Sequence, residues 1–236
     1  MNNFLKSHLN ILSKKFSNPD LELRVLLNKC SINKKDIIFS NFDINNIDLK
    51  KFSVAFNRRL KREPISKIYN SKSFWKYNFY VNKNVLDPRP ETELIIEKVL
   101  ENFPNKKDNF KILDLCTGSG CLAISLAKEY LNSEITATDI SLKALNVAKK
   151  NANMINCINQ IKFVKSNLIN KIEKNDIIVS NPPYLSMQEY EKTLPEIRKY
   201  EPKIALLASR GGYEFYWKIS NFLKNILKDN SKAFIE

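Results

Sequence analysis

Residues 111–131, KILDLCTGSGCLAISLAKEYL, read as a strand, a tight loop and a helix in succession. The whole chain of 236 residues contains only 4 glycines, and two of them, Gly118 and Gly120, lie in this loop. Glycine allows a tight turn and lets a ligand approach the backbone closely. The loop DLCTGSG therefore predicts a ligand site between the strand and the helix, although a lone G-x-G pair also fits an ordinary turn.

Strands and helices continue to alternate after this stretch. The segments EITATD, IKFVKSN and DIIVSN are strand-like, and SLKALNVAKKNANMIN reads as a helix that Ser141 caps. These strands are too apolar to have one face in water, so they predict a parallel sheet with helices on both faces, which is an α/β fold. A further strand candidate, KAFIE, occupies residues 232–236. Ligands of such sheets bind beside the carboxyl ends of the strands.

The N-terminal part has a different pattern. Apolar residues recur at helical spacing from Leu5 to Phe16, and Asn18 is a candidate cap for a second helix. A third apolar-periodic stretch covers residues 46–60. We therefore expect residues 1–70 to form a small helical bundle, which carries no catalytic constellation of its own.

A short linker is expected between the two parts. Residues 71–88 begin with aromatic side chains that alternate with polar ones, as in a β-hairpin. The segment DPRPETE follows at residues 87–93, and Thr92 is a candidate cap for the helix ELIIEKVLENF. The predicted organisation is thus a helical domain, a hairpin linker and a sheet domain over residues 89–236.

Composition excludes several kinds of site. His8 is the only histidine, which disfavours a His-based metal site and a Ser-His-Asp triad. The four cysteines form no C-x-x-C pair, so we expect free thiols and no bound metal. No apolar run is long enough to span a membrane, and the N-terminus lacks the apolar centre of a signal peptide. These features indicate a cytoplasmic protein without membrane contact, and we expect a monomer.

The net charge of +14 allows two interpretations. It favours an anionic partner, with at least a weak nucleic-acid contact through a basic surface. It also fits a general compositional preference for Lys, Asn and Ile, because the basic residues are spread along the chain and no block dominates.

The acidic residue at the end of the second strand narrows the choice of ligand. Asp139 follows Asp114 by 25 residues, and an acidic residue in this place typically binds ribose hydroxyls. Ala123 replaces the third glycine of a dinucleotide motif, and no lysine follows the loop as in a P-loop. An adenosine ligand without a pyrophosphate fits better, and S-adenosylmethionine (SAM) is such a ligand.

The motif NPPY, residues 181–184, follows the strand DIIVS. Its two prolines stiffen the loop and end the strand. The side chain of Asn181 and the carbonyl of Pro182 offer two acceptors for one planar NH2 group, and Tyr184 offers a ring for stacking. The motif predicts a clamp for an amide or an exocyclic amino nitrogen, although a structural Pro-Pro turn would have the same sequence.

Together these motifs resemble one family. DLCTGSG, TDIS, IVSNPPY and EPKIAL, preceded by FWKYNFYVNKNVLDPRPETE, closely resemble the HemK/PrmC family of protein-(glutamine-N5) methyltransferases, which act on peptide chain release factors. The resemblance implies a class I, Rossmann-like SAM-dependent methyltransferase domain with a small N-terminal helical bundle and a β-hairpin linker. NPPY alone is shared with adenine-N6 methyltransferases, but its combination with DPRPETE is more specific.

The resemblance also implies roles for individual residues. The SAM-binding residues would be Cys116, Thr117, Gly118, Ser119, Gly120, Asp139, Asn167, Leu168 and Asn181. The glutamine amide would be bound by Asn181, Pro182, Pro183 and Tyr184, of which Asn181, Pro182 and Tyr184 would be catalytic. The target would be the glutamine of a Gly-Gly-Gln loop, and the helical domain would help to dock the release factor.

The chain departs from the family pattern in several places. Cys116 stands where glycine is frequent, and Asn167 replaces a usual aspartate, although its carbonyl oxygen can still accept from the adenine amino group. The segment LASRGGYEF, residues 207–215, also differs. The family normally continues past KAFIE with a helix and two more strands, so we expect the sheet domain to be short at its C-terminal side.

Three alternatives stay open. NPPY and the positive charge also fit an adenine-N6 methyltransferase of DNA or RNA. The glycine loop also fits a ribosomal-protein glutamine methyltransferase. A degenerate methyltransferase fold that only binds RNA is the alternative without catalysis.

Overall fold

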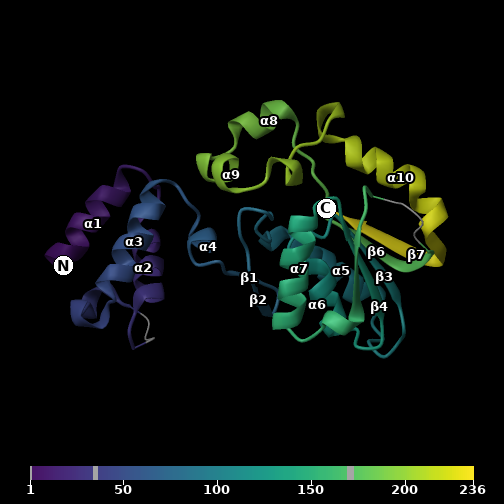
Figure 1. Cartoon of the computed structure of the whole chain (residues 1–236), viewed down its shortest axis with the longest axis horizontal. Coiled ribbons are helices and arrows are strands. Elements are labelled where there is room, and N and C mark those ends of the chain that lie inside the picture. The colour runs from purple at the N-terminus through teal and green to yellow at the C-terminus, as the bar shows by residue number, and fades with distance from the viewer. Residues whose placement is uncertain (1, 34–36, 169–172) are drawn as a thin grey trace. The chain divides into compact units, whose positions relative to one another are not determined.

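The computed structural model describes residues 2–33, 37–168 and 173–236. The chain divides into two compact units, Met1–Tyr69 and Asn70–Glu236 (Figure 1). Within the described ranges, no helix combines the length and the apolar character needed to cross a membrane.

The N-terminal unit is helical. Its elements are α1 (Asn3–Ser13), α2 (Pro19–Cys30), α3 (Leu49–Leu60), α4 (Ile65–Ile68) and the 3-10 turns η1 (Phe39–Asn41) and η2 (Ile44–Asn46). As predicted, the side chain of Asn18 caps α2 by accepting from the backbone N–H of Leu21. The third helix begins later than predicted, because Asp48 caps it by accepting from the N–H of Lys51. Leucine and phenylalanine side chains dominate the core of this unit.

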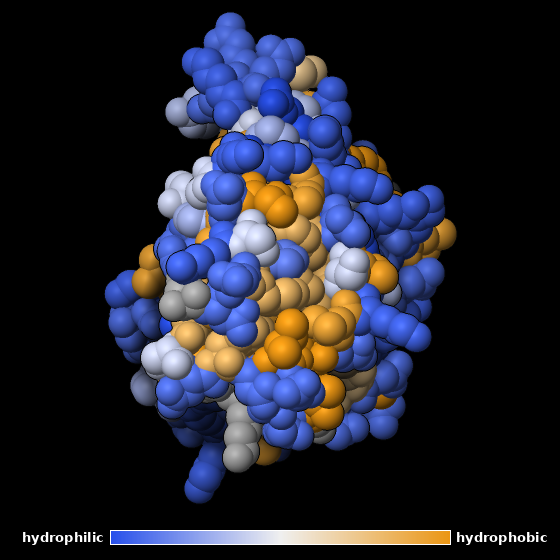
Figure 2. Space-filling view, turned by 90° about the vertical axis from the view of Figure 1, so that its left-hand side faces the viewer, coloured by the Kyte–Doolittle hydropathy of each residue, from blue (hydrophilic) through white to orange (hydrophobic). Residues whose placement is uncertain are grey.

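Apolar side chains also reach the surface of the N-terminal unit. Figure 2 views the molecule from the side on which Figure 1 draws α1, and apolar atoms gather in the middle of that face. The exposed large apolar side chains of the unit are Ile11, Leu21, Ile32, Ile38, Leu49 and Val54. Exposed apolar area of this kind is typical of surfaces that contact other molecules.

A two-stranded hairpin begins the second unit. Strands β1 (Lys72–Phe74) and β2 (Tyr77–Phe79) pair in antiparallel register. The strands end earlier than the sequence predicted. After β2 the chain turns to pack Val81 and Val85 against Ala144 and Val147. The residues between the hairpin and the sheet therefore lie beside the helix that carries these two side chains.

The centre of the second unit is a parallel sheet of five strands (Figure 1). The strand order is β5-β4-β3-β6-β7, and every pair is parallel, which confirms the predicted α/β class. The bounds are β3 (Lys111–Leu115), β4 (Glu134–Asp139), β5 (Ile161–Lys165), β6 (Asn175–Ser180) and β7 (Leu227–Ile235). From β3 the chain first adds β4 and β5 on one side of the sheet. It then adds β6 and β7 on the other side of β3. The order therefore switches direction at β3, and a crevice opens there at the carboxyl ends.

Helices cover both faces of this sheet. They are α5 (Glu93–Asn102), α6 (Cys121–Glu129), α7 (Leu142–Met154) and α10 (Glu214–Ile226). The short helices α8 (Met187–Lys192) and α9 (Pro195–Tyr200) belong to the segment between β6 and α10. Ile112 of β3 packs in one core with α5 and α6, whereas its neighbour Leu113 packs in another core with α10. Successive residues of a strand point to opposite faces, so the apolar run of β3 is explained by burial on both sides.

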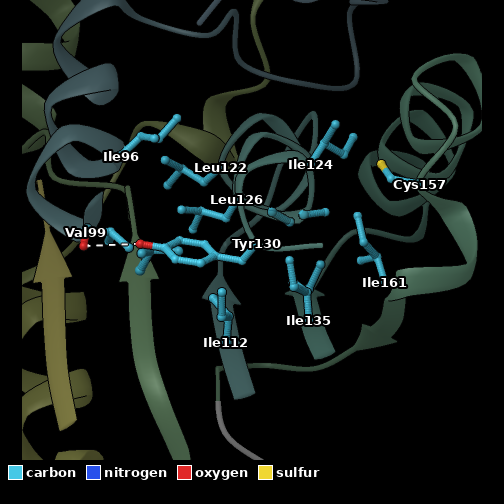
Figure 3. Packing of buried hydrophobic residues seen from close by; sticks show 14 of the residues in the cluster. Ile96, Val99, Ile112, Leu122, Ile124, Leu126, Tyr130, Ile135, Cys157 and Ile161 are labelled. Atoms are coloured by element: carbon cyan, nitrogen blue, oxygen red, sulfur yellow. Dashed lines mark hydrogen bonds between the residues drawn. The ribbon is translucent and has the colours of Figure 1, made fainter. Parts of the chain in front are cut away.

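Figure 3 shows the larger core around Tyr130, which follows α6. The Tyr130 ring is fully buried among isoleucine and leucine side chains. Its hydroxyl donates to the carbonyl oxygen of Phe103 at 2.8 Å and lies 3.4 Å from that of Val99. A buried tyrosine hydroxyl needs such a partner, and here it ties α6 to the end of α5.

A buried carboxylate joins the hairpin to the sheet domain. Glu129 accepts from Trp75 Nε1 at 2.9 Å, from Lys76 Nζ at 2.5 Å and from Lys106 Nζ at 2.5 Å. Burial by itself raises the pKa of Glu129, but the hydrogen bonds from Lys106, Lys76 and Trp75 outweigh it and lower this pKa to about 2. The ionised carboxylate is therefore stabilised by folding.

Glu129→Gln is expected to lower the free energy of unfolding at pH 7 by about 1–2 kcal/mol, a modest loss because both lysine side chains are exposed. Because the folded pKa is depressed, the wild-type advantage is present above about pH 4.5 and is lost as the pH falls through about 2. Urea unfolding of both proteins at pH 7 and pH 3 checks this. Equal midpoints at pH 7 would contradict it, and exposed Glu97→Gln is the control.

Candidate active site

A cavity of about 300 Å³ opens at the carboxyl ends of the central strands. Its wall includes the loop after β3, the end of β4, the residues after β5 and the residues after β6. Predicted site residues in this wall are Cys116, Thr117, Gly118, Ser119, Asp139, Asn167, Leu168, Asn181 and Pro183. The structure thus brings most of the predicted residues, which come from four segments of the chain, to a single cavity.

Gly120 is a predicted site residue that does not line the cavity. It has a φ of +82°, which favours glycine. A Cβ at this position would lie 2.9 Å from Ile124 Cδ1 and 3.0 Å from Ala148 Cβ. Gly120 therefore lets α6 begin in close contact with α7, while Gly118 contributes to the cavity wall itself.

The carboxylate of Asp139 is fixed by the backbone. Its Oδ2 accepts from the N–H of Gly118 at 2.9 Å, and its Oδ1 accepts from the N–H of Ser141 at 2.8 Å. Burial raises the pKa of Asp139, and these two hydrogen bonds act in the opposite direction. Each carboxylate oxygen can accept a further hydrogen bond, so Asp139 is an oriented acceptor between the glycine loop and the end of β4.

Asp114 is a second acidic group in the wall, and sequence reasoning gave it no role in the site. Its Oδ2 accepts from Thr117 Oγ1 at 2.6 Å and from the N–H of Ala123 at 3.1 Å. Burial raises the pKa of Asp114 to about 7. The sequence position of Asp114 could have identified it as a site residue. It lies near the end of an otherwise apolar strand, where a buried charge costs free energy.

Among the described residues, the buried atoms Asp114 Oδ1, Ser166 Oγ and Asn181 Oδ1 of the cavity wall have no hydrogen-bond partner. Leaving such an atom without a partner costs free energy, so each one indicates a missing ligand group or water. The amide oxygen of Asn181 only accepts hydrogen bonds, and the carboxyl oxygen of Asp114 does so when it is ionised. The cavity therefore fits a ligand that brings hydrogen-bond donors at several points.

The side chain of Asn181 has a defined orientation. Its Nδ2 donates to Thr92 Oγ1 and to Glu236 Oε2, both at 2.8 Å. Thr92 was expected to cap α5, and this expectation was wrong. The Thr92 hydroxyl makes no capping bond and instead donates to Glu236 Oε2 at 2.6 Å.

Two residues of the NPPY motif lie outside the cavity wall. Pro182 is buried and Tyr184 is 39% exposed, and neither lines the cavity, whereas Pro183 does. The carbonyl of Tyr184 lies against Gly212, where a Cβ would approach it to 2.4 Å. Segment 207–215, which differs from the family pattern, therefore supports the backbone of the NPPY loop.

An ion pair connects two of the sequence motifs at the cavity. Arg89 of DPRPETE donates to Glu201 of EPKIAL at 2.6 Å, and the Glu201 side chain is buried. Glu201 also accepts from the N–H of Asp87 at 3.4 Å. Asp87, Arg89 and the neighbouring Pro202 line the cavity, so the ion pair holds two distant segments along its edge.

The cysteines of the cavity wall are unsuited to nucleophilic chemistry. Cys116 and Cys121 both line the cavity as free thiols. Burial raises the pKa of each thiol to about 12. Both thiols are therefore protonated at neutral pH, and the nucleophilic thiolate is not formed.

Comparisons with known proteins find methyltransferases. The family model "Methyltransferase small domain" matches residues 90–198. A release factor glutamine methyltransferase of Clostridium acetobutylicum is 38% identical over 204 residues, which cover 83% of this chain and 71% of that protein. Its counterpart from Lactococcus lactis is 41% identical over 194 residues, covering 82% and 70%.

Longer relatives match as well. A bifunctional methyltransferase of Rickettsia bellii is 38% identical over 249 residues, which cover 93% of this chain and 45% of that protein. The chain thus spans about half the length of the Rickettsia relatives. Among solved structures, a methyltransferase from Pyrococcus furiosus has a TM-score of 0.49 at 21% identity and covers 78% of each chain.

Proposed function

Because the chain belongs to the HemK/PrmC family of release factor glutamine methyltransferases, we propose that it transfers a methyl group from SAM to the side-chain amide nitrogen of a release factor glutamine. One observation carries the proposal. Asn181 Oδ1 is a buried acceptor without a partner, and it shares a cavity with the glycine loop and with Asp139. A substrate N–H and a nucleoside ligand could therefore meet in one place.

The cavity wall fits the polar groups of SAM. In the proposal, Asp139 binds the ribose hydroxyls, and residues 116–119 surround the amino-acid part. Asn167 and Leu168 border the adenine. The buried Asp114 Oδ1, which has no hydrogen-bond partner among the described residues, would accept from the ammonium group. When bound, SAM supplies the electrophilic methyl group, and the protein binds and orients it.

The NPPY residues would hold the nucleophile. An amide nitrogen is a poor nucleophile because its lone pair is delocalised into the carbonyl group. In the proposal, Asn181 Oδ1 and the Pro182 carbonyl accept the two amide N–H groups, and the exposed Tyr184 ring packs on the incoming loop. Acceptance by two oxygens polarises the N–H bonds and favours a pyramidal nitrogen as positive charge develops.

No titrating base is required before transfer. The product nitrogen is cationic and can lose its proton to water after the methyl group has moved. The remaining acceleration comes from alignment, for which effective molarities of about 10⁵ M are attainable. The protonated state of Cys116 and Cys121 agrees with this scheme, since neither thiol is prepared to attack.

The proposal is tested by incubating the full chain with labelled SAM and a purified release factor. We expect label in the native factor and none in a factor whose Gly-Gly-Gln glutamine is replaced by alanine. Equal label in the two factors would contradict the proposal. Label that disappears after nuclease treatment would favour adenine-N6 methylation, and label in ribosomal protein alone would favour that substrate.

The pH dependence of SAM binding gives a further test. Because the pKa of Asp114 is raised to about 7 by burial, half of this carboxyl is protonated at pH 7 and most of it at pH 6. SAM would bind the ionised form, so we expect its affinity to rise about fivefold from pH 6 to pH 7. Calorimetry in two buffers should also show proton release on binding.

The control for this prediction is Asp114→Asn, which keeps the size of the side chain and cannot titrate. We expect its SAM affinity to be weaker and flat over the same pH range. An affinity of the wild-type protein that does not change between pH 6 and pH 7 would remove Asp114 from the ligand site.

A further inference from the structure

We infer that Thr92 and Glu236 are positioning residues, which fix the orientation of the Asn181 side-chain amide so that its carbonyl oxygen alone is left to accept from a substrate. The identity of that substrate rests on the proposed function. The orientation of the amide does not, because it follows from contacts within the protein.

Three hydrogen bonds join these side chains in a closed triangle. Asn181 Nδ2 donates to Thr92 Oγ1 and to Glu236 Oε2 at 2.8 Å each, and Thr92 Oγ1 donates to Glu236 Oε2 at 2.6 Å. An asparagine amide has two N–H donors, and both have an acceptor here. The opposite atom, Asn181 Oδ1, is buried and has no hydrogen-bond partner in the described part of the chain.

The carboxylate gives this triangle its direction. A carboxylate only accepts hydrogen bonds, so the single hydroxyl hydrogen of Thr92 points to Glu236. The hydroxyl oxygen then acts as an acceptor towards Asn181. If the amide were flipped, Asn181 Oδ1 would lie against two acceptors, and both N–H donors would be removed from their partners. The network therefore discriminates between the two ends of the amide.

The negative charge of Glu236 also changes the chemistry of Asn181. A hydrogen bond from an amide N–H to a carboxylate polarises the amide and increases electron density on its oxygen. Asn181 Oδ1 thus becomes a stronger acceptor for a substrate N–H that gains positive charge. Thr92 and Glu236 would act on the substrate through Asn181, to which both side chains are hydrogen-bonded.

The network is anchored from three separate parts of the chain. Thr92 belongs to the 3-10 turn η3 (Pro90–Thr92) and is buried. The backbone N–H of Glu236 donates to the carbonyl of Ser180, the last residue of β6, at 3.1 Å. Tyr216 of α10 donates its hydroxyl to the carbonyl of Glu236 at 2.6 Å. The parallel pairing of β6 with β7 brings Glu236 beside Asn181 (Figure 1).

Steady-state kinetics with SAM and release factor tests the inference through two substitutions. Thr92→Val keeps the shape of the side chain and removes its hydroxyl, and Glu236→Gln keeps an acceptor and removes the charge. We expect each to lower kcat about tenfold and to leave the Kd for SAM within about twofold of wild type. Thr92→Ser retains the hydroxyl and should restore kcat to within about threefold.

Matched controls separate positioning from folding. Thr136→Val removes a hydroxyl from β4 outside the cavity wall, and Glu97→Gln removes a charge from the exposed face of α5. Both should keep the wild-type kcat. Wild-type kcat in Thr92→Val and Glu236→Gln would overturn the inference. An equal loss in Thr92→Val and Thr92→Ser would also overturn it, because the second variant keeps the hydroxyl.

The side-chain amide signals of Asn181 in NMR spectra give a readout without any substrate. The signals are identified by their absence in Asn181→Ala. In the wild type, both amide protons should exchange slowly with solvent, and Thr92→Val should shift the signals and accelerate exchange. Unchanged signals would overturn the inference even if the enzyme is active. A wild-type protein that shows the slow exchange but does not methylate release factor would instead overturn the proposed function alone.

Discussion

Asn181→Ala is expected to lower kcat by about 10²–10³-fold while the affinity for SAM changes little. The substitution removes a buried acceptor of the cavity that the protein holds in a fixed direction and that has no hydrogen-bond partner among the described residues. An acceptor that becomes more favourable as charge develops on the substrate nitrogen stabilises the transition state more than the bound ground state. The loss should therefore fall on kcat.

Single-turnover kinetics with release factor in excess measures this effect, and calorimetry measures SAM binding to the same variant. Thr136→Val in β4 is the control for a change in the sheet domain away from the cavity wall. If Asn181→Ala retained wild-type kcat, Asn181 would have no part in methyl transfer. A lost SAM affinity with normal kcat at saturation would assign Asn181 to the cofactor alone.

Asp139→Ala is expected to weaken SAM binding by about 100-fold, with a much smaller effect on kcat at saturating SAM. The carboxylate would lose its hydrogen bonds to the ribose and also the two that hold the backbone N–H groups of Gly118 and Ser141. Hydrogen bonds to a charged group contribute about 1.5–3 kcal/mol each, and 2.7 kcal/mol corresponds to 100-fold in affinity.

Calorimetric titration of SAM into the variant provides the measurement, and the melting temperature shows whether the loop is still folded. Asp108→Ala is a suitable control because Asp108 is exposed and lies outside the cavity wall. A dissociation constant within twofold of wild type would contradict the assignment of Asp139 to the nucleoside.

The architecture of the sheet domain could be predicted from local patterns. The apolar runs on either side of DLCTGSG predicted parallel strands. A strand that is buried on both faces does not alternate apolar with polar residues. Asp139 could be placed in the site because it ends the strand that neighbours β3. The nine predicted residues that line the cavity lie at the carboxyl ends of these strands or within the next few residues.

The side-chain network at Asn181 could not be predicted. Asn181 is separated from Thr92 by 89 residues and from Glu236 by 55, so no spacing pattern connects them. Thr92 also occupies a position where a threonine normally caps a helix, and the local rule gave the wrong partner for its hydroxyl. The hydrogen-bond partner of the Thr92 hydroxyl is set by a tertiary contact with Glu236.

Motif position alone does not fix the direction in which a residue points. Gly120, Pro182 and Tyr184 were predicted as site residues from their motifs, and the structure places them outside the cavity wall. Ser166 was missed because its significance lies in a buried hydroxyl oxygen that has no partner among the described residues, which only a three-dimensional structure reveals. Asp114 was missed although an aspartate near the end of an apolar strand was a signal for it.

Tandem mass spectrometry of the methylated release factor tests the central claim most directly, because it locates the transferred methyl group on a single residue. We predict a mass increase of one methyl group on the side chain of the glutamine in the Gly-Gly-Gln loop, and its absence when Asn181→Ala is used. A methyl group on any other residue of the factor, or no modification by a chain that binds SAM, would contradict the account.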